Sequence, residues 1–237
     1  MSSAPYVIIT GASRGFGKAI AEIFAANGYN LVITARRPVA LYTAMEALQA
    51  KFPDITIKAK PADISQKEEV IALGQWILDA VPTIDVLVNN AGNFVPGSVH
   101  NEPDGALEEM MNTNLYSAYH LTRALIPRMM EQQSGHIFNM CSIASLQSYA
   151  NGGAYSISKF ALLGFSKNLR EEMKSHGIKV TSVIPGAAWT DSWIGSGVDP
   201  HRVMESGDIA KMVFAASQLS PQACVEEIVL RPQLGDL

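Results

Sequence analysis

A tyrosine and a lysine four residues apart, with a serine upstream, are the side chains in this sequence best suited to move a proton. Tyr155 and Lys159 stand in Tyr-Ser-Ile-Ser-Lys, so in a helix the phenol and the ammonium share one face about one turn apart. A nearby cation favours the phenolate and lowers the tyrosine pKa from its usual value of about 10. Ser142 can hold a carbonyl oxygen against the phenol. The spacing indicates proton transfer to or from an alcohol oxygen, and a surface Tyr–Lys pair at helical spacing is the alternative.

The composition is that of an ordinary globular protein. The chain has 237 residues, of which 48% are hydrophobic and 17% charged, and its net charge is −4 without a basic stripe. This balance argues against nucleic acid and membrane surfaces as partners. No apolar run approaches the ~20 residues of a membrane span, and the N-terminal residues lack the features of a signal peptide. We therefore expect a cytoplasmic protein.

The cysteines and histidines give no pattern of a metal site. Cys141 and Cys224 have neither metal-ligand nor disulfide spacing, and the five histidines are scattered along the chain. We therefore expect no metal.

Strand-like and helix-like segments alternate along the whole chain. Strands are expected at 6–10, 30–35, 55–59, 85–89, 136–141, 179–184 and 227–230. Helices are expected at 18–27, 38–51, 65–80, 104–132, 154–176 and 208–219, with Ser65 and Glu68 forming a capping box at the third helix. The short connections and the absence of a linker or repeat predict one domain over residues 1–237. Its expected architecture is a parallel sheet with helices on both faces.

The candidate functional segments follow predicted strands. In an open parallel sheet, ligands bind beyond the carboxyl ends of the strands. Those segments are 11–17, Asp63, 89–92, Ser142 and 185–190. We expect them to gather at one edge of the sheet.

The glycine-rich turn after the first predicted strand suits a dinucleotide. Glycines there let the backbone and a helix N-terminus approach a pyrophosphate, although a tight turn without a ligand is the alternative. An acidic residue at the end of the second strand would bind the ribose of NAD, but Ala35-Arg36-Arg37 stands there. With Arg14 in the turn, these arginines suit the 2′-phosphate of NADP(H), unless they are only solvated surface charges. We expect NADP(H) as the cofactor.

Taken together, these motifs resemble the short-chain dehydrogenase/reductase family over nearly all of the chain. The resemblance rests on Thr10-Gly-x-x-x-Gly-x-Gly17, Asn89-Asn-Ala-Gly92 and Tyr155-x-x-x-Lys159. It implies an α/β fold: a single-domain Rossmann fold with a seven-stranded parallel sheet. It further implies that Asn114, Ser142, Tyr155 and Lys159 are the catalytic residues. The cofactor-binding residues would be Gly11, Ser13, Arg14, Gly15, Phe16, Gly17, Arg36, Arg37, Asp63, Ile64, Asn90, Ala91, Gly92, Tyr155, Lys159, Pro185, Gly186, Ala188 and Thr190.

The resemblance also implies a role for each catalytic residue. Tyr155 would protonate the carbonyl oxygen of a small-molecule substrate while the nicotinamide delivers hydride to carbon. Lys159 would bind the nicotinamide ribose and lower the tyrosine pKa. Ser142 would orient the substrate oxygen, and Asn114 would hold a water that supports proton resupply.

Three features depart from the family pattern. Cys141 stands where many members have a serine, and we expect a buried filler, with redox sensing as the alternative. The segment 225–237 lacks the usual glycine-rich ending and is similar to bacterial reductases that include sepiapterin-reductase-like proteins. The segment 190–207 is also short, which predicts a small lid over an open pocket.

Several large side chains are candidates for the substrate pocket or for an interface. Trp189 and Trp193 would either line the pocket or anchor their loop, and Phe94, Leu146 and Tyr149 are further pocket candidates. The apolar helix residues Met110, Met111, Leu121 and Leu125 fit a homodimer or homotetramer, or equally an ordinary core face.

The sequence therefore predicts an NADPH-dependent reductase of a ketone or aldehyde. The substrate could be a 3-oxoacyl thioester, a pterin side-chain ketone or another small carbonyl compound, because a single sequence does not fix the pocket. An NAD-dependent alcohol or sugar dehydrogenase and a catalytically silent NADP-binding regulatory protein are the alternatives.

Overall fold

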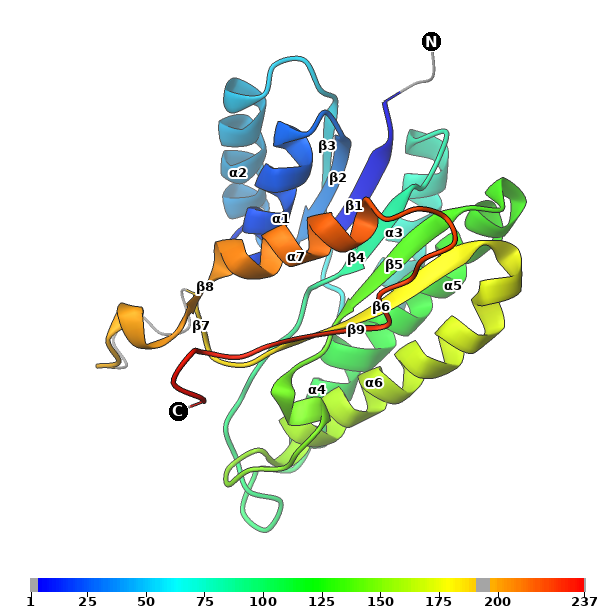
Figure 1. Ribbon diagram of the computed structural model, residues 1–237. Coiled ribbons are helices and arrows are strands. Elements are labelled where there is room, and N and C mark those ends of the chain that lie inside the picture. The colour runs from blue at the N-terminus through cyan, green and yellow to red at the C-terminus, as the bar shows by residue number, and fades with distance from the viewer. Residues whose placement is uncertain (1–3, 191–196, 237) are drawn as a thin grey trace.

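Seven parallel strands form the sheet at the centre of the molecule (Figure 1). The structure is a computed structural model in which residues 4–190 and 197–236 are described. The strands are β1 (Tyr6–Thr10), β2 (Asn30–Ala35), β3 (Ile57–Pro61), β4 (Val86–Asn89), β5 (Gly135–Met140), β6 (Ile178–Pro185) and β9 (Glu227–Leu230). Their order is β3-β2-β1-β4-β5-β6-β9, so the direction of winding reverses between β1 and β4. The predicted seven-stranded parallel sheet of a single Rossmann-like domain is confirmed.

Helices cover both faces of this sheet (Figure 1). On one face lie α1 (Gly15–Ala26), α2 (Pro38–Lys51) and α7 (Ser206–Ser217), and on the other lie α3 (Lys67–Ala80), α5 (Ser117–Gln132) and α6 (Gly153–Met173). Along β1, Val7 and Ile9 pack in the first layer and Ile8 in the second, because neighbouring residues of a strand point to opposite faces. Burial on both sides explains why β1 and β4 contain so few polar residues, whereas the edge strands β3 and β9 are only partly buried and carry charged residues.

The expected helix over 104–132 is interrupted. It consists of α4 (Ala106–Met111), a π-helical turn (Asn112–Tyr116) and α5, and the Ser117 N–H donates to the Asn112 carbonyl as an i→i+5 bond requires. Such a turn holds one residue more than an α-helical turn and is frequent at functional sites.

The expected capping box at Ser65 and Glu68 is wrong. The Ser65 hydroxyl and N–H both donate to Asp63 Oδ1, at 2.8 and 3.0 Å, so they form a local turn and leave Gln66 as the residue before α3. Glu69 reaches back instead and accepts from the Asp63 N–H at 2.7 Å. The other differences are shifts of element ends, such as α1 beginning at Gly15 and β3 beginning at Ile57.

The helix residues proposed for an interface are mostly in the core. Met110, Leu121 and Leu125 are buried, which confirms the core interpretation for these three. Among the described residues, the exposed apolar side chains on α4 and α6 are instead Leu107, Ile157 and Phe160. In that same part of the chain, no helix is both long and apolar enough to cross a membrane.

Candidate active site

The turn between β1 and α1 packs tightly against the residues that follow β4. Asn90 Nδ2 donates to the carbonyl oxygens of Thr10 and Gly11 at 2.8 and 3.2 Å, and the Thr10 hydroxyl accepts from the N–H groups of Asn90 and Ala91. Gly11 has φ +68°, and a Cβ there would lie 2.9 Å from Ala91 Cα. A Cβ on Gly17 would lie 2.5 Å from Asn90 Nδ2 and would clash with the Gly11 carbonyl. Both glycines are required by close backbone approach.

The three arginines predicted to bind a 2′-phosphate lie beyond the carboxyl ends of β1 and β2, as expected from the sequence. Arg14 directly precedes α1, and Arg36 and Arg37 follow Ala35, the last residue of β2. All three arginines are exposed. The end of β2 therefore carries positive charge where an NAD-binding chain would carry a carboxylate.

The remaining cofactor candidates occupy neighbouring connections. Ser13, Gly15 and Phe16 are in the turn after β1, and Asp63 and Ile64 follow β3. A Cβ on Gly15 would lie 3.6 Å from Thr190 Cγ2, so the Thr190 side chain lies next to the glycine turn after β1.

Ser142 and Tyr155 meet just beyond the end of β5. Ser142 is buried and precedes the 3₁₀ turn Ile143–Ser145, where its hydroxyl accepts from the Ala144 N–H at 3.2 Å. Tyr155 lies in the first turn of α6, and its phenol hydrogen-bonds with Ser142. The predicted pair is therefore brought together.

The pKa of Tyr155 is raised, which is opposite to the direction expected from its spacing to Lys159. Burial is the largest cause, and the hydrogen bond with Ser142 opposes it. The Lys159 ammonium lies 5.8 Å from the centroid of the Tyr155 ring and donates to the Met140 carbonyl at 2.7 Å. Lys159 is itself buried, and burial lowers its pKa to about 8. Burial thus sets the direction of the Tyr155 pKa, and Cys141 raises it further.

Asn114 is buried in the π-helical turn and joins two segments of the site. Its Oδ1 accepts from the Asn93 N–H at 2.7 Å, and its Nδ2 donates to the Asn93 carbonyl at 3.0 Å and to Ser158 Oγ at 2.9 Å. A Cβ on Gly92 would lie 3.0 Å from Asn114 Oδ1 and 3.5 Å from Lys159 Nζ. Asn114 and Lys159 therefore both lie next to Gly92, in the segment after β4.

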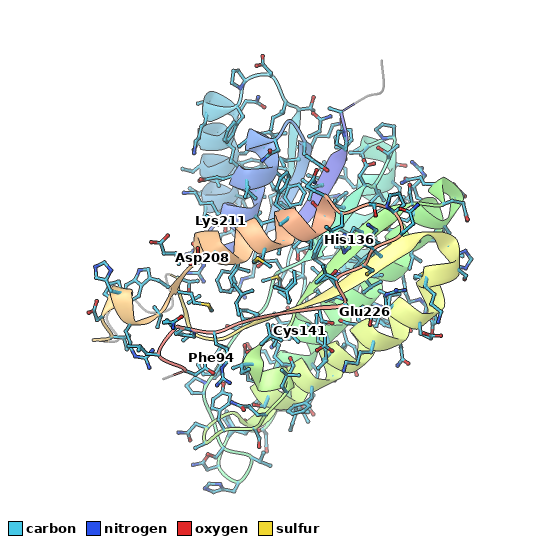
Figure 2. All side chains as sticks on the ribbon, viewed as in Figure 1. Phe94, His136, Cys141, Asp208, Lys211 and Glu226 are labelled. Atoms are coloured by element: carbon cyan, nitrogen blue, oxygen red, sulfur yellow. The ribbon has the colours of Figure 1, made fainter. Side chains whose placement is uncertain are left out.

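The exposed wall of the site comes from loops. Phe94 packs edge-to-face on Tyr155 with ring centroids 4.8 Å apart, and Figure 2 shows it in the lower half of the view, on the left. Tyr149 is half-exposed, and burial, together with Tyr155, raises its pKa to about 12. Leu146 is also exposed, whereas Trp189 pairs with Glu205 in the short strands β7 (Ala188–Trp189) and β8 (Met204–Glu205). The expectation for Trp193 falls outside the described residues.

Cys141 is a buried thiol between the sheet and α6. Burial raises its pKa to about 11, and the positive charge of Lys159 opposes this shift. A thiol of this kind is a poor nucleophile at neutral pH, so its burial favours the filler interpretation.

Two contributions to the site were not found from the sequence. The chain after β9 folds back on the Pro185-Gly186 turn, where a Cβ on Gly186 would clash with the Asp236 carboxylate. Arg202 holds this segment by donating to the carbonyls of Gly235 and Leu234 at 2.9 and 3.3 Å. The second is Glu102, whose carboxylate binds the first turn of α6. Neither has a local motif, because both depend on contacts between distant segments.

Known proteins are similar over almost the full length. The family model described as short chain dehydrogenase matches residues 5–197. The sepiapterin reductase of Chlorobaculum tepidum is 33% identical over 98% of this chain and 97% of its own, and an uncharacterized oxidoreductase of Staphylococcus saprophyticus is 30% identical over 95% and 96%.

Solved structures agree with this similarity. A metagenomic short-chain oxidoreductase in complex with NADP has a TM-score of 0.84 and 31% identity, covering 98% of both chains. The L-sorbose reductase of Gluconobacter frateurii, complexed with NADPH and L-sorbose, has a TM-score of 0.88 and 27% identity, covering 96% of this chain and 95% of its own.

Proposed function

The chain belongs to the short-chain dehydrogenase family of oxidoreductases, and from that premise we propose that it is an NADPH-dependent reductase of a ketone or aldehyde. The observation that carries the proposal is the group formed by the buried Ser142 and Lys159 and the partly buried Tyr155 beyond the carboxyl end of β5. Catalysis by this group needs a substrate oxygen beside the Tyr155 phenol, and Ser142 is placed to donate a hydrogen bond to it.

The residues present fit NADP(H). The glycine turn at the N-terminus of α1 suits a pyrophosphate, and Arg14, Arg36 and Arg37 suit a 2′-phosphate. When bound, NADPH supplies the hydride. Several similar solved structures are complexes with NADP or NADPH. We assign Asp63 and Ile64 to the adenine ring and Pro185, Gly186, Ala188 and Thr190 to the nicotinamide.

The raised pKa of Tyr155 favours reduction. A phenol that stays protonated near neutral pH is a proton donor, so Tyr155 acts as the general acid toward the carbonyl oxygen. Lys159, with a pKa of about 8, is mostly protonated at pH 7 and places a positive charge beside the phenolate that forms. Asn114, bonded to Asn93 and Ser158, fixes the helix segment through which a water could return the proton.

The substrate is proposed as a small carbonyl compound. A pterin side-chain ketone is the first to test, because a relative with 33% identity is a sepiapterin reductase, followed by 3-oxoacyl thioesters. We also propose one domain over residues 1–237, a cytoplasmic location, and a homodimer or homotetramer that covers the exposed apolar residues Leu107, Ile157 and Phe160.

The test is NADPH and NADH oxidation, followed by absorbance over a panel of ketones, diketones, pterins and acyl thioesters. Tyr155→Phe should lower kcat by about 10²–10⁴-fold, since the proton donor is lost, with a much smaller effect on the Kd of NADPH. Undiminished turnover in Tyr155→Phe would remove the tyrosine from the mechanism. Tight NADPH binding with no turnover of the whole panel would favour the regulatory alternative.

The cofactor preference has its own test. Replacing Arg36 and Arg37 together by Ala should raise the KM for NADPH about 10–100-fold and leave that for NADH unchanged, because only NADPH carries the 2′-phosphate. Lys211→Ala, an exposed cation on α7, is the matched control. A wild-type preference for NADH would overturn the assignment of these arginines.

A further inference from the structure

Glu102 reaches from the loop after β4 to the helix that carries Tyr155. Its Oε2 accepts a hydrogen bond from the Ala154 N–H at 3.2 Å, across 52 positions of sequence. α6 begins at Gly153, and no side chain of its own N-cap residue, Gly152, satisfies the free N–H groups of its first turn. A carboxylate at this position satisfies one of these donors and interacts favourably with the positive end of the helix dipole.

Two glycines give the Glu102 side chain its space. A Cβ on Gly153 would lie 2.5 Å from Glu102 Oε2, and a Cβ on Gly97 would lie 3.0 Å from Glu102 Cβ. Both positions therefore exclude other residues while the glutamate is in place. The carboxylate is packed between the loop and the helix rather than resting on an open surface.

Further bonds join the same two segments. The Gly97 N–H donates to the Asn151 carbonyl at 3.1 Å, and Ser98 Oγ bonds to Asn151 Oδ1 at 2.9 Å. Asn151 adopts φ +59°, in the left-handed region. The loop 93–105, which carries Phe94, is thereby fixed to the residues directly before α6.

We propose that Glu102 is a positioning residue for Tyr155: by binding the Ala154 N–H and joining loop 93–105 to α6, it sets where the phenol stands relative to Ser142 and Phe94. The inference rests on the proposed function, since the position of the phenol matters through proton donation. Ala154 is the immediate neighbour of Tyr155, so a shift of the first helical turn moves the phenol directly. A displacement of about 1 Å in a reacting group can lower the rate about 100-fold.

The ionisation of Tyr155 gives this position a signature that can be read without a substrate. Ser142 lowers the Tyr155 pKa, so a phenol that moves away from Ser142 should ionise at higher pH. The other titratable groups beside the phenol are Lys159 on the same helix, Cys141 after β5 and Tyr149 in the preceding loop.

The experiment compares Glu102→Gln and Glu102→Ala with Glu108→Gln, an exposed glutamate of α4 as the matched control. The amide of Gln keeps an acceptor for the Ala154 N–H and removes only the charge. Tyr155 ionisation is read from tyrosinate absorbance, as the difference between each variant and the same variant carrying Tyr155→Phe. kcat/KM is measured against pH with the best carbonyl substrate, and the Kd of NADPH by fluorescence.

Glu102→Gln should leave the tyrosinate titration unshifted and keep kcat/KM within about threefold of wild type, because it keeps the acceptor. Glu102→Ala should shift the tyrosinate titration to higher pH and lower kcat/KM about tenfold or more at an unchanged Kd of NADPH. An unshifted titration in Glu102→Ala, or activity in Glu102→Ala equal to that of Glu108→Gln, would overturn the proposal. Tyrosinate absorbance needs no substrate, so failure of the reductase assignment is read separately, from wild type that turns over no carbonyl.

Discussion

The two ends of the sheet use polar side chains for different purposes. At the amino ends of the strands, these groups bind the fold itself. Asp85 Oδ2 accepts from the Tyr6 N–H at 2.8 Å and from Thr83 Oγ1 at 3.0 Å, and the Gln132 amide makes two 3.0 Å bonds to the backbone of Ile84. His136 lies at this end and Phe94 at the other, as Figure 2 shows. Here polar groups stabilise the connections between strands.

At the carboxyl ends of the strands, the polar side chains are held in place but can still contact a cofactor or a substrate. The amide of Asn90 fixes the glycine turn, and Lys159 donates to the Met140 carbonyl. Tyr155 is partly buried, and the exposed loop residue Phe94 packs on its ring. We infer that substitutions at the amino ends of the strands lower stability and leave catalysis unchanged. Substitutions at the carboxyl ends should lower catalysis and leave stability unchanged, unless they affect backbone packing.

Gly17→Ala should have the largest effect. It should lower both the stability and the affinity for NADPH, and so it would be an exception to the separation between the two ends of the sheet. The added methyl group meets the Gly11 carbonyl and Asn90 Nδ2, so the turn must move. Overpacking of this kind costs about 3 kcal/mol of unfolding free energy. We expect the Kd of NADPH to rise about 100-fold or more, because the backbone leaves its place beside the pyrophosphate. Urea unfolding and NADPH fluorescence measure the two effects.

Gly164→Ala is the control for that change. Gly164 is an exposed residue within α6, and a Cβ there would meet nothing within 4 Å. Alanine favours a helix over glycine by about 1 kcal/mol, so this variant should gain stability and keep its affinity for NADPH. Equal losses in both variants would contradict the packing argument.

His136 provides the test at the amino end, with a smaller effect that appears only in acid. Burial lowers its pKa from 6.5 to about 3. Its Nε2 donates to Thr181 Oγ1 at 2.7 Å, since the Thr181 hydroxyl itself donates to the Val225 carbonyl, and its buried Nδ1 has no partner among the described residues. A second ring proton would therefore have nothing to bind.

The sign of the pH effect follows from these values. Below pH 6.5 the unfolded chain takes up a proton that the folded chain refuses until about pH 3, so stability falls as the pH falls through this window. The loss should reach about 2–3 kcal/mol by pH 4.5. His136→Gln should reduce this loss in urea unfolding and leave kcat at pH 7.5 unchanged, whereas His201→Gln, on the surface, should behave as wild type. If the stability of His136→Gln falls below pH 6.5 as much as that of wild type, His136 is not the cause of the loss.

Phe94→Leu should have the smallest effect and would sharpen the comparison. The side chain is 50% exposed, so the unfolding free energy should change by less than about 0.5 kcal/mol. Its edge-to-face contact with Tyr155 is worth about 0.5–1.5 kcal/mol, which corresponds to a change in kcat/KM of about two- to tenfold. Val99→Ala, in the same loop and more exposed, should change neither quantity. A loss of stability without a change in kcat/KM would place Phe94 with the structural groups.

The parts of the molecule that were predictable are those fixed by local constraints. Burial on both faces makes β1 and β4 continuous apolar or β-branched runs, and the close contacts of Gly11 and Gly17 with the residues after β4 require glycine there. The position of Tyr155 opposite Ser142 followed from the order of strand, loop and helix.

The parts that were not predictable depend on distant segments or on burial. The predicted capping box is absent because the N–H and the hydroxyl of Ser65 both donate to the Asp63 carboxylate. The direction of the Tyr155 pKa was wrong because the spacing to Lys159 reports a cation but not the depth at which the phenol lies. Glu102 has no motif, since its partner Ala154 is 52 residues away.

The extra residue in the π-helical turn ties chain length to the position of Asn114. Deleting one residue there would restore a continuous α-helix and keep α4 and α5 nearly in phase, because the π-helical turn takes up one residue more than an α-helical turn. Met110 would then stay in the core, whereas Asn114, which lies inside the turn, would lose its place beside Asn93 and Ser158. A single-residue deletion in this helix therefore acts on the catalytic site and spares the packing of the helix against the sheet.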